Sequence, residues 1–162
     1  MNFTTNVRKK SKQVIQKGID KGMTVSGAES CTGGLIAKLL TDIPGSSSVF
    51  CGACVTYTNE VKEKVLGVDP AIIRAHTEIS HACAKAMAEG ARRAFGTDLA
   101  YSTTGYAGPG GGTETDPVGT VYVGISTNEG TESYRITVPD STRTQVRNAA
   151  AAFVLEKLIS KT

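Results

Sequence analysis

The organisation of the chain follows from residues 25–35, which read Val25-Ser26-Gly27-Ala28-Glu29-Ser30-Cys31-Thr32-Gly33-Gly34-Leu35. Residues up to Val25 alternate like a strand, and apolar residues from Leu35 onward recur at helical spacing, so residues 29–34 form a strand-to-helix corner. Ser30 and Cys31 place a hydroxyl and a thiol at this corner, where we expect the chemistry. An isolated Ser-Cys pair is, however, more often a capping or packing feature.

The rest of the corner is suited to binding a ligand. Thr32 is a good N-cap, and Gly33 and Gly34 let the backbone approach a ligand closely. The unpaired N–H groups of the first helical turn would then point at that ligand and favour an anion or a developing oxyanion.

Composition bounds the class of protein. The chain has 162 residues, of which 40% are hydrophobic and 20% charged, as in a soluble globular protein, and we expect a single domain over residues 1–162. The net charge is +3 and the basic residues are scattered along the chain, which argues against nucleic acid as the main ligand. The slight positive charge suits a small anionic substrate. No apolar run approaches 18 residues and no secretory signal is present, so we expect a cytoplasmic protein with no membrane partner.

The four cysteines give little sign of a metal site. Cys51 and Cys54 form a C-x-x-C, but on a strand these positions point to opposite faces. A zinc site would have to borrow Cys83, His76 or His81, and buried free thiols are the simpler explanation. We therefore expect no metal and no cofactor.

Helices and strands alternate along the chain. Helices are predicted over residues 4–20, 35–41, 59–67, from 70, 80–95 and from about 141, and further strands over 49–57, 98–104, 118–126 and 132–138. The strand at 49–57 carries no charge, which predicts an interior position in the sheet. The pattern predicts an α/β fold, a three-layer α/β/α arrangement with a mixed sheet of about five strands.

Polar residues follow three of these strands, where ligands gather in open α/β sheets. Lys62 lies in the first turn of its predicted helix. There the helix dipole and burial would lower the pKa of its ammonium, so that the neutral amine could serve as a base. A lone lysine is, however, more often at the surface. Tyr57 would place its hydroxyl at the wet end of the sheet. His76 and His81 lie far from the glycine-rich corners, so a Ser-His-Asp triad is weakly supported.

The glycine-rich loop from Gly105 to Thr113 follows the strand at 98–104. It runs into another strand rather than a helix, so it is not a dinucleotide-binding fingerprint. A nest of N–H groups for phosphate and a flexible hairpin loop remain equally good interpretations.

Five motifs, in order, resemble the CinA C-terminal domain family. They are Ala28-Glu29-Ser30-Cys31-Thr32-Gly33-Gly34, Pro44-Gly45-Ser46-Ser47, Val55-Thr56-Tyr57-Thr58-Asn59-Glu60-Val61-Lys62, Thr104-Gly105-Tyr106-Ala107-Gly108-Pro109-Gly110-Gly111-Gly112-Thr113 and Pro117-Val118-Gly119-Thr120-Val121. The resemblance extends to Asp140-Ser141-Thr142-Arg143 and Arg147.

This resemblance implies a nicotinamide-nucleotide amidase, which hydrolyses the carboxamide of nicotinamide mononucleotide to nicotinate mononucleotide and ammonia. Some members carry a further N-terminal domain, and we expect this chain to be the stand-alone form. The motif serine and lysine, Ser30 and Lys62 here, are taken in the family as nucleophile and base. Family members form oligomers, so we expect a homodimer or a higher homo-oligomer with a pyridine nucleotide as the small-molecule partner.

The resemblance also suggests roles for neighbouring residues. The oxyanion would be held by N–H groups of the Thr32-Gly33-Gly34 turn or by the hydroxyls of Ser47 and Thr104, and Tyr57 would orient Lys62 or stack on the pyridinium. Substrate phosphate would meet Arg143 and the loop that starts at Gly105 and includes Gly110 and Gly111. Departures from the family pattern fall at Tyr106, which we expect to narrow the pocket, and at Thr58 and His81.

Two other functions fit the same residues. One is a non-catalytic nucleotide-binding or regulatory module, which the presence of both Ser30 and Lys62 disfavours. The other is a thiol hydrolase, in which a Cys31 thiolate is favoured by the helix N-terminus.

Overall fold

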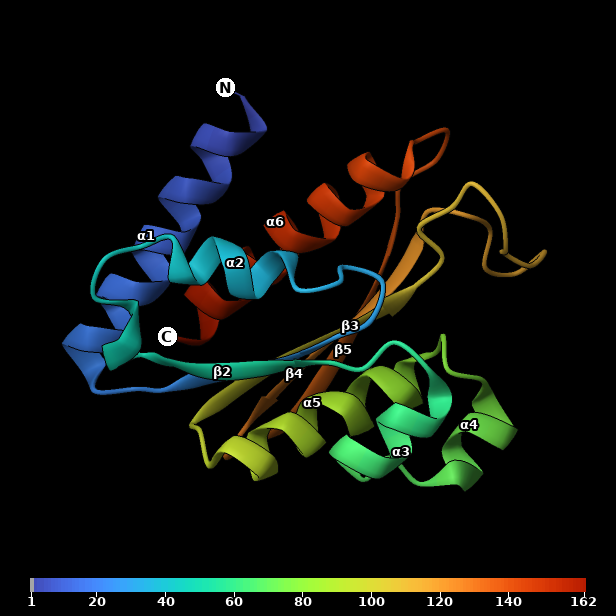
Figure 1. Ribbon diagram of the computed structural model, residues 1–162, viewed down its shortest axis with the longest axis horizontal. Coiled ribbons are helices and arrows are strands. Elements are labelled where there is room, and N and C mark those ends of the chain that lie inside the picture. The colour runs from blue at the N-terminus through green and yellow to red at the C-terminus, as the bar shows by residue number, and fades with distance from the viewer. Residues whose placement is uncertain (1) are drawn as a thin grey trace.

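The computed structural model describes residues 2–162 and forms three layers, with helices on both faces of one sheet (Figure 1). The strands are β1 (Val25–Glu29), β2 (Phe50–Val55), β3 (Leu99–Gly105), β4 (Thr120–Thr127) and β5 (Gly130–Thr137). The helices are α1 (Phe3–Lys21), α2 (Leu35–Thr41), the 3-10 turn η1 (Ser46–Ser48), α3 (Asn59–Leu66), α4 (Pro70–His76), α5 (His81–Phe95) and α6 (Arg143–Lys161). The three-layer, five-stranded mixed sheet is as predicted, and Met1 of the expected domain lies outside the described residues.

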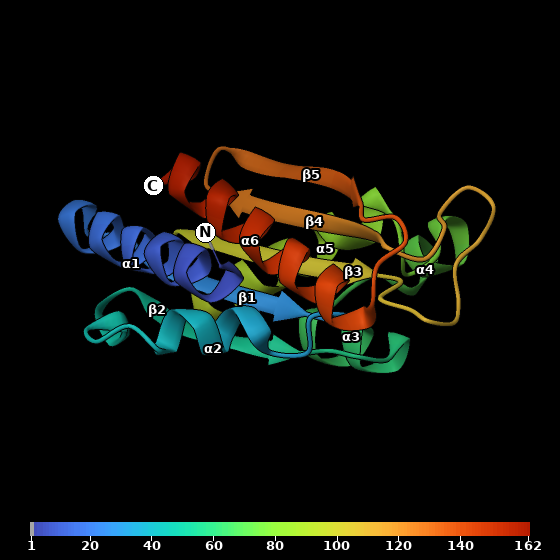
Figure 2. The same cartoon turned by 90° about the horizontal axis from the view of Figure 1, so that it is seen from above.

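The strand order places β1 between the two strands that follow it along the chain. The order is β2-β1-β3-β4-β5, in which β1 is parallel to β2 and β3, while β4 and β5 are antiparallel additions. The connection from β1 to β2 and the connection from β2 to β3 run in opposite directions along the sheet, and because parallel crossovers are right-handed, α2 and α5 lie on opposite faces (Figure 2). A crevice therefore opens at the carboxyl end of β1, where ligands bind in such sheets.

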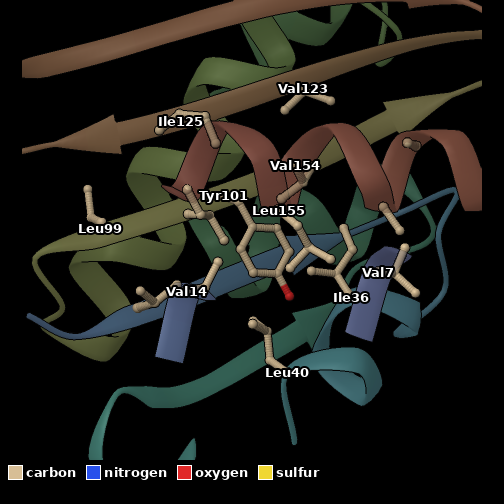
Figure 3. Packing of buried hydrophobic residues seen from close by; sticks show 14 of the residues in the cluster. Val7, Val14, Ile36, Leu40, Leu99, Tyr101, Val123, Ile125, Val154 and Leu155 are labelled. Atoms are coloured by element: carbon tan, nitrogen blue, oxygen red, sulfur yellow. The ribbon is translucent and has the colours of Figure 1, made fainter. Parts of the chain in front are cut away.

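The main core lies between the sheet and the layer of α1, α2 and α6 (Figure 3). Tyr101 of β3 is fully buried at its centre, and its hydroxyl donates to Glu29 Oε2 at 3.0 Å. Gly27 on the neighbouring strand makes room for the ring, because a Cβ there would lie 2.1 Å from Tyr101 Cζ. The glycine is thus needed for close packing.

The predicted interior position of the strand at 49–57 is wrong, because β2 is an edge strand. Its lack of charge has another cause: α2 and α5 cover its two faces, and a Cβ at Gly52 would meet the Phe95 ring at 2.7 Å. Its outer edge is open, and Val55 at its end is 51% exposed. The absence of charge in β2 therefore reflects the helices that cover its two faces, and not the presence of a neighbouring strand on each side.

None of the helices formed by residues 2–162 combines the length and apolar character that a membrane crossing requires.

Candidate active site

A cavity of about 190 Å³ lies at the carboxyl ends of the parallel strands. Its lining consists of Ser30, Cys31, Tyr57, Asn59, Lys62, Glu78, Ile79, Thr104, Gly105, Ala107 and Arg143. Seven of the residues singled out from the sequence, from five separate segments, therefore meet here: Ser30, Cys31, Tyr57, Lys62, Thr104, Gly105 and Arg143. A larger hollow of about 630 Å³ lies near Met23 and the β4–β5 turn, at the other end of the sheet.

Ser30 and Lys62 are in direct contact in this cavity. The Nζ atom of Lys62 lies 3.1 Å from Ser30 Oγ, and it also contacts the carbonyl oxygens of Thr56 at 3.0 Å and Tyr57 at 3.3 Å. Lys62 is only 1% exposed, and none of the four ion pairs found among residues 2–162 includes it. The lysine is thus buried without a carboxylate partner.

Burial lowers the pKa of the Lys62 ammonium. Nearby acidic groups act in the opposite direction but are weaker than the desolvation. The contacts suit the neutral amine, since its two hydrogens match the two carbonyl oxygens and its lone pair then faces the Ser30 hydroxyl. A lysine in this state can accept the serine proton.

The start of α3 explains how Lys62 reaches the strand ends. Thr58, the N-cap, accepts a hydrogen bond from the N–H of Val61 at 3.4 Å, so the helix begins directly after β2. Side chains on a helix tilt toward its N-terminus, which directs Lys62 back toward Ser30. The alternative interpretation of Lys62 as a surface lysine is therefore wrong.

The predicted helix cap at Thr32 is wrong, because α2 begins at Leu35 with Gly34 as its N-cap. The Glu29 carboxylate accepts hydrogen bonds from two N–H groups of the first turn of α2, that of Ile36 at 3.1 Å and that of Ala37 at 2.9 Å. The Thr32 hydroxyl instead donates to Glu29 Oε1 at 2.7 Å. A protein carboxylate thus occupies the anion site that the sequence suggested for a ligand.

Cys31 lines the cavity but is poorly suited to act as a nucleophile. It is 5% exposed, and burial raises the pKa of its thiol to about 12. The predicted thiolate at the helix N-terminus fails for the reason just given, because the positive end of α2 already faces Glu29. Its thiol stays protonated at neutral pH.

Arg143 and Tyr57 form the outer rim of the cavity. Arg143 is the first residue of α6, and its guanidinium donates to Tyr57 Oη at 2.6 Å and to the carbonyl oxygen of Gly108 at 2.8 Å. Thr142 caps α6 in a capping box with Gln145, which fixes where the helix begins. Tyr57 is 57% exposed, and its hydrogen bond with Lys62 is made by its backbone carbonyl oxygen.

Several other predicted site residues are not placed as expected. Ser47 lies in η1 before β2, at the opposite end of the sheet, so its predicted place at the oxyanion is wrong. Gly33 and Gly34 adopt positive φ values of 59° and 95° in the turn, and Arg147, which donates to the carbonyl oxygen of Thr32 at 2.8 Å, lies against Gly33. Thr104 lines the cavity, but its hydroxyl donates to the carbonyl oxygen of Glu78 at 2.7 Å.

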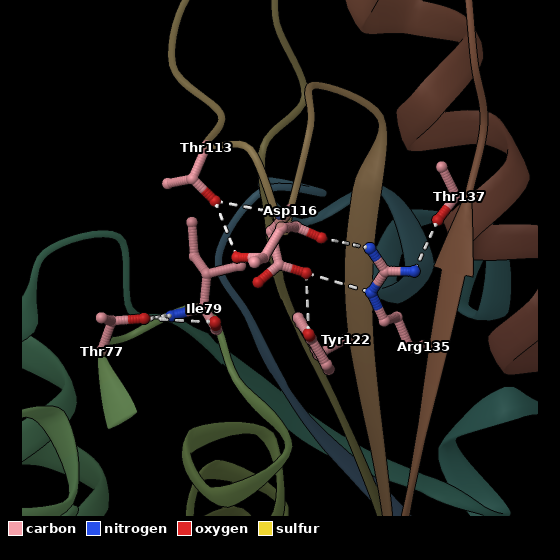
Figure 4. Close-up of polar contacts among 8 residues, drawn as sticks. Thr77, Ile79, Thr113, Asp116, Tyr122, Arg135 and Thr137 are labelled. Carbon is pink, nitrogen blue, oxygen red and sulfur yellow. Dashed lines mark hydrogen bonds and ion pairs between the residues drawn. The ribbon is translucent and has the colours of Figure 1, made fainter. Parts of the chain in front are cut away.

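The glycine-rich loop is anchored rather than loose (Figure 4). Asp116 accepts hydrogen bonds from Tyr122 Oη at 2.8 Å and from Arg135 Nε at 3.0 Å, and Arg135 also donates to the carbonyl oxygen of Thr115. Gly110 and Gly111 lie before this anchor and are not among the cavity-lining residues.

Tyr106 does not narrow the cavity as expected. Its ring packs beside Ile79 and Tyr122 and lies against Gly111. His81 contacts Ser133 at 2.7 Å and the Tyr122 ring, and neither histidine lines the cavity.

Sequence reasoning missed Asn59, Glu78, Ile79 and Ala107, which also line the cavity. An acidic residue two positions before the Ser80 helix cap was the available signal for Glu78. Among residues 2–162, no group of three or more His, Cys, Asp or Glu side chains is arranged to hold a metal ion.

The fold and the cavity define an α/β protein with a serine and a lysine at the central strand ends. The chain belongs to the CinA C-terminal domain family, whose sequence pattern matches residues 7–162. It is 50% identical over 137 residues to a CinA-like protein of Shewanella denitrificans, covering 85% of this chain and 32% of that protein. It is 46% identical over 140 residues to the nicotinamide-nucleotide amidohydrolase PncC of Shewanella oneidensis, covering 86% of this chain and 33% of that one.

The fold is shared with solved structures of the same family. The crystal structure of competence/damage inducible protein CihA from Agrobacterium tumefaciens superposes with a TM-score of 0.93 at 38% identity, covering 96% of this chain and 94% of that one. The chain spans about a third of the length of the curated relatives it matches.

Proposed function

We propose that the protein is a nicotinamide-nucleotide amidase, which converts nicotinamide mononucleotide and water to nicotinate mononucleotide and ammonia. The observation that carries this proposal is the 3.1 Å contact between Lys62 Nζ and Ser30 Oγ in a cavity at the strand ends. The relative named as a nicotinamide-nucleotide amidohydrolase supports the choice of substrate.

In the first half of the reaction, Ser30 Oγ attacks the carboxamide carbon while neutral Lys62 takes the hydroxyl proton. The C–N bond then breaks, and the Lys62 ammonium returns the proton to the departing nitrogen, which leaves as ammonia. In the second half, Lys62 takes a proton from water, the water oxygen attacks the ester carbon, and the acid leaves as the proton returns to Ser30.

The oxyanion requires N–H donors near Ser30. The N–H of Gly33 donates to the carbonyl oxygen of Ser30 and that of Ser30 to the carbonyl oxygen of Thr103, so these two are occupied. The N–H groups of Cys31, Thr32 and Gly34 have no backbone acceptor among residues 2–162, and of these three we assign the N–H of Thr32 to the oxyanion.

The size of the cavity suits the reacting end of the nucleotide. A volume of about 190 Å³ is below that of typical sites for whole drug-sized ligands, so the ring and its carboxamide would enter while the ribose phosphate extends outward. The exposed Arg143 guanidinium at the rim would meet the phosphate there. Tyr57 beside it would stack on the ring or the ribose.

The alternative is a non-catalytic nucleotide-binding module. A buried lysine without a carboxylate partner is costly for stability, which argues against keeping it in a protein that only binds. The proposed chemistry gives this arrangement a purpose.

Ammonia release from nicotinamide mononucleotide by the Ser30→Ala and Cys31→Ala variants tests the proposal. We expect Ser30→Ala to lose activity by about a thousandfold or more, and Cys31→Ala to stay within a few-fold of the wild type. Full activity in Ser30→Ala would remove the assignment. Loss only in Cys31→Ala would establish a thiol hydrolase, and absence of activity in the wild type would favour the binding module.

A further inference from the structure

Glu78 is the one acidic residue among those lining the cavity, and the mechanism above does not use it. It is half-buried in the segment between α4 and α5. None of the four ion pairs found among residues 2–162 includes its carboxylate. An acidic side chain in a binding cavity without a protein cation to balance it is available to a ligand.

The backbone holds Glu78 in place. Its carbonyl oxygen accepts the Thr104 hydroxyl at 2.7 Å, which ties it to the end of β3. On the other side, the N–H of Ile79 donates to Thr77 Oγ1 at 3.3 Å (Figure 4). Thr77 has a φ of 67° and a ψ of 168°, a conformation that is costly for a β-branched residue. The backbone at Glu78 is therefore held in place, while no hydrogen bond or ion pair to its carboxylate is found among residues 2–162.

Lysine, glutamate and arginine side chains meet in the cavity. Lys62, Glu78 and Arg143 are the only Lys, Arg, Asp or Glu residues among those that line it. Lys62 is buried beside Ser30, while Arg143 is exposed at the rim. A substrate with a positive ring next to its amide and a negative group further out matches this arrangement.

We propose that Glu78 recognises the positive charge of a quaternised pyridinium ring, so that the cavity selects cationic aromatic carboxamides over neutral ones. This inference rests on the proposed function and names the substrate class of the same site. Glu78 is thereby a specificity-determining residue, separate from the serine and lysine that carry out the reaction.

A pyridinium bound beside Glu78 would also activate Lys62. Three titratable groups near Lys62 would raise its pKa if they were ionised: Cys83 of α5, Glu78 of the loop and Cys31 of the turn after β1. Burial raises the pKa of Cys83 to about 11 and that of Cys31 to about 12, so both thiols are uncharged at neutral pH. Glu78 is then the charge that favours protonated Lys62, and a cation paired with Glu78 offsets this and favours the neutral base.

Nicotinamide and 1-methylnicotinamide test the proposal, because they differ by one methyl group and one positive charge. We expect the wild type to have the higher kcat/KM for 1-methylnicotinamide, and Glu78→Gln to reduce that preference about fivefold. The acid limb of its pH profile should also shift to lower pH. Glu60→Gln, which removes an exposed acidic charge outside the cavity, is the matched control and should leave the preference unchanged.

An unchanged preference in Glu78→Gln would overturn the proposal while leaving the amidase assignment intact. Should that variant not fold, the wild type gives the same information, because a preference based on charge should weaken as salt rises from about 0.01 M to about 1 M. A salt-independent preference would count against Glu78.

Measurement of ligand binding without turnover tests the role of Glu78 independently of the proposed amidase activity. Titration calorimetry with 1-methylnicotinamide compares Ser30→Ala with the double variant Ser30→Ala/Glu78→Gln. If the wild type releases ammonia from no amide, the amidase assignment fails, and about fivefold weaker binding by the double variant would still support cation recognition. Equal binding by the two variants would refute it.

Discussion

Lys62 Nζ lies 3.1 Å from Ser30 Oγ, although 31 residues separate the two in sequence and each follows a different strand. The pairing of β1 with β2 brings them together, because Glu29 and Val55 are register partners at the carboxyl ends of these strands. The parallel register thus sets the distance on which the proposed reaction depends.

Replacement of Lys62 by Met should lower kcat by about 10²- to 10⁴-fold, since the base is lost while the apolar stem is retained. Activity of the wild type should rise with pH, with a midpoint below 10.5, because burial lowers the pKa of Lys62 from that value. Initial rates of ammonia release across pH would measure both. A pH-independent wild-type rate would contradict the role of a titrating lysine.

The same pKa shift predicts a pH-dependent stability. Between its folded pKa and 10.5, Lys62 is protonated in the unfolded chain but not in the folded one, so stability rises with pH in that window. The free energy of unfolding of the wild type relative to Lys62→Met should therefore increase with pH. A flat difference in urea denaturation would show that the lysine stays charged when folded.

Arg143→Ala should raise KM for nicotinamide mononucleotide by about tenfold or more and leave KM for nicotinamide nearly unchanged, because only the nucleotide carries phosphate. Steady-state kinetics with the two substrates measures the difference. Arg74→Ala removes an exposed arginine on α4 and serves as the control. Equal effects on the two substrates would place the phosphate elsewhere.

Gly27→Ala should destabilise the protein by about 3 kcal/mol, because the new methyl group overlaps the buried Tyr101 ring. Gly110→Ala is the control: no heavy atom lies within 4 Å of the added Cβ, and the change should stay within about 0.5 kcal/mol. Urea denaturation measures both. Equal stability of the two variants would mean that the core around Tyr101 adapts freely.

The open edge of β2 is our candidate for a homodimer contact. It is uncharged, its last residue Val55 is exposed, and the exposed Tyr57 follows two positions later, a combination that favours pairing with another chain. Cys51→Arg should convert a dimer to a monomer in sedimentation velocity, while Asn128→Arg in the β4–β5 turn should not. A dimer that survives the β2 substitution would place the interface on another surface.

Local patterns predicted the elements and most of the candidate site. Ser30, Tyr57, Lys62 and Thr104 all follow or end strands, and the ends of neighbouring parallel strands meet at one edge of a sheet. Ser47 was misplaced because it belongs to a motif close to Tyr57 in sequence, whereas β2 separates them by roughly 20 Å of extended chain.

Two features depended on tertiary structure. The position of β2 at the edge follows from the order in which the strands are connected. The local sequence of residues 49–57 gives no information about that order. The role of Glu29 depends on α2 folding back over the sheet, so that a strand carboxylate meets the N–H groups of Ile36 and Ala37. Residue type alone favoured Thr32 as the cap.

The buried Glu29 carboxylate has a practical consequence for mutational scanning. It accepts hydrogen bonds from Thr32, Tyr101 and the first turn of α2, and it directly precedes Ser30 in the chain. Its removal would therefore disturb both the position of Ser30 and the packing of the core. A screen that scores turnover alone would rank Glu29 with the reacting groups, although its oxygens face inward. Melting temperatures measured together with each rate would show that loss of Glu29 lowers the stability of the fold, which identifies its role as structural.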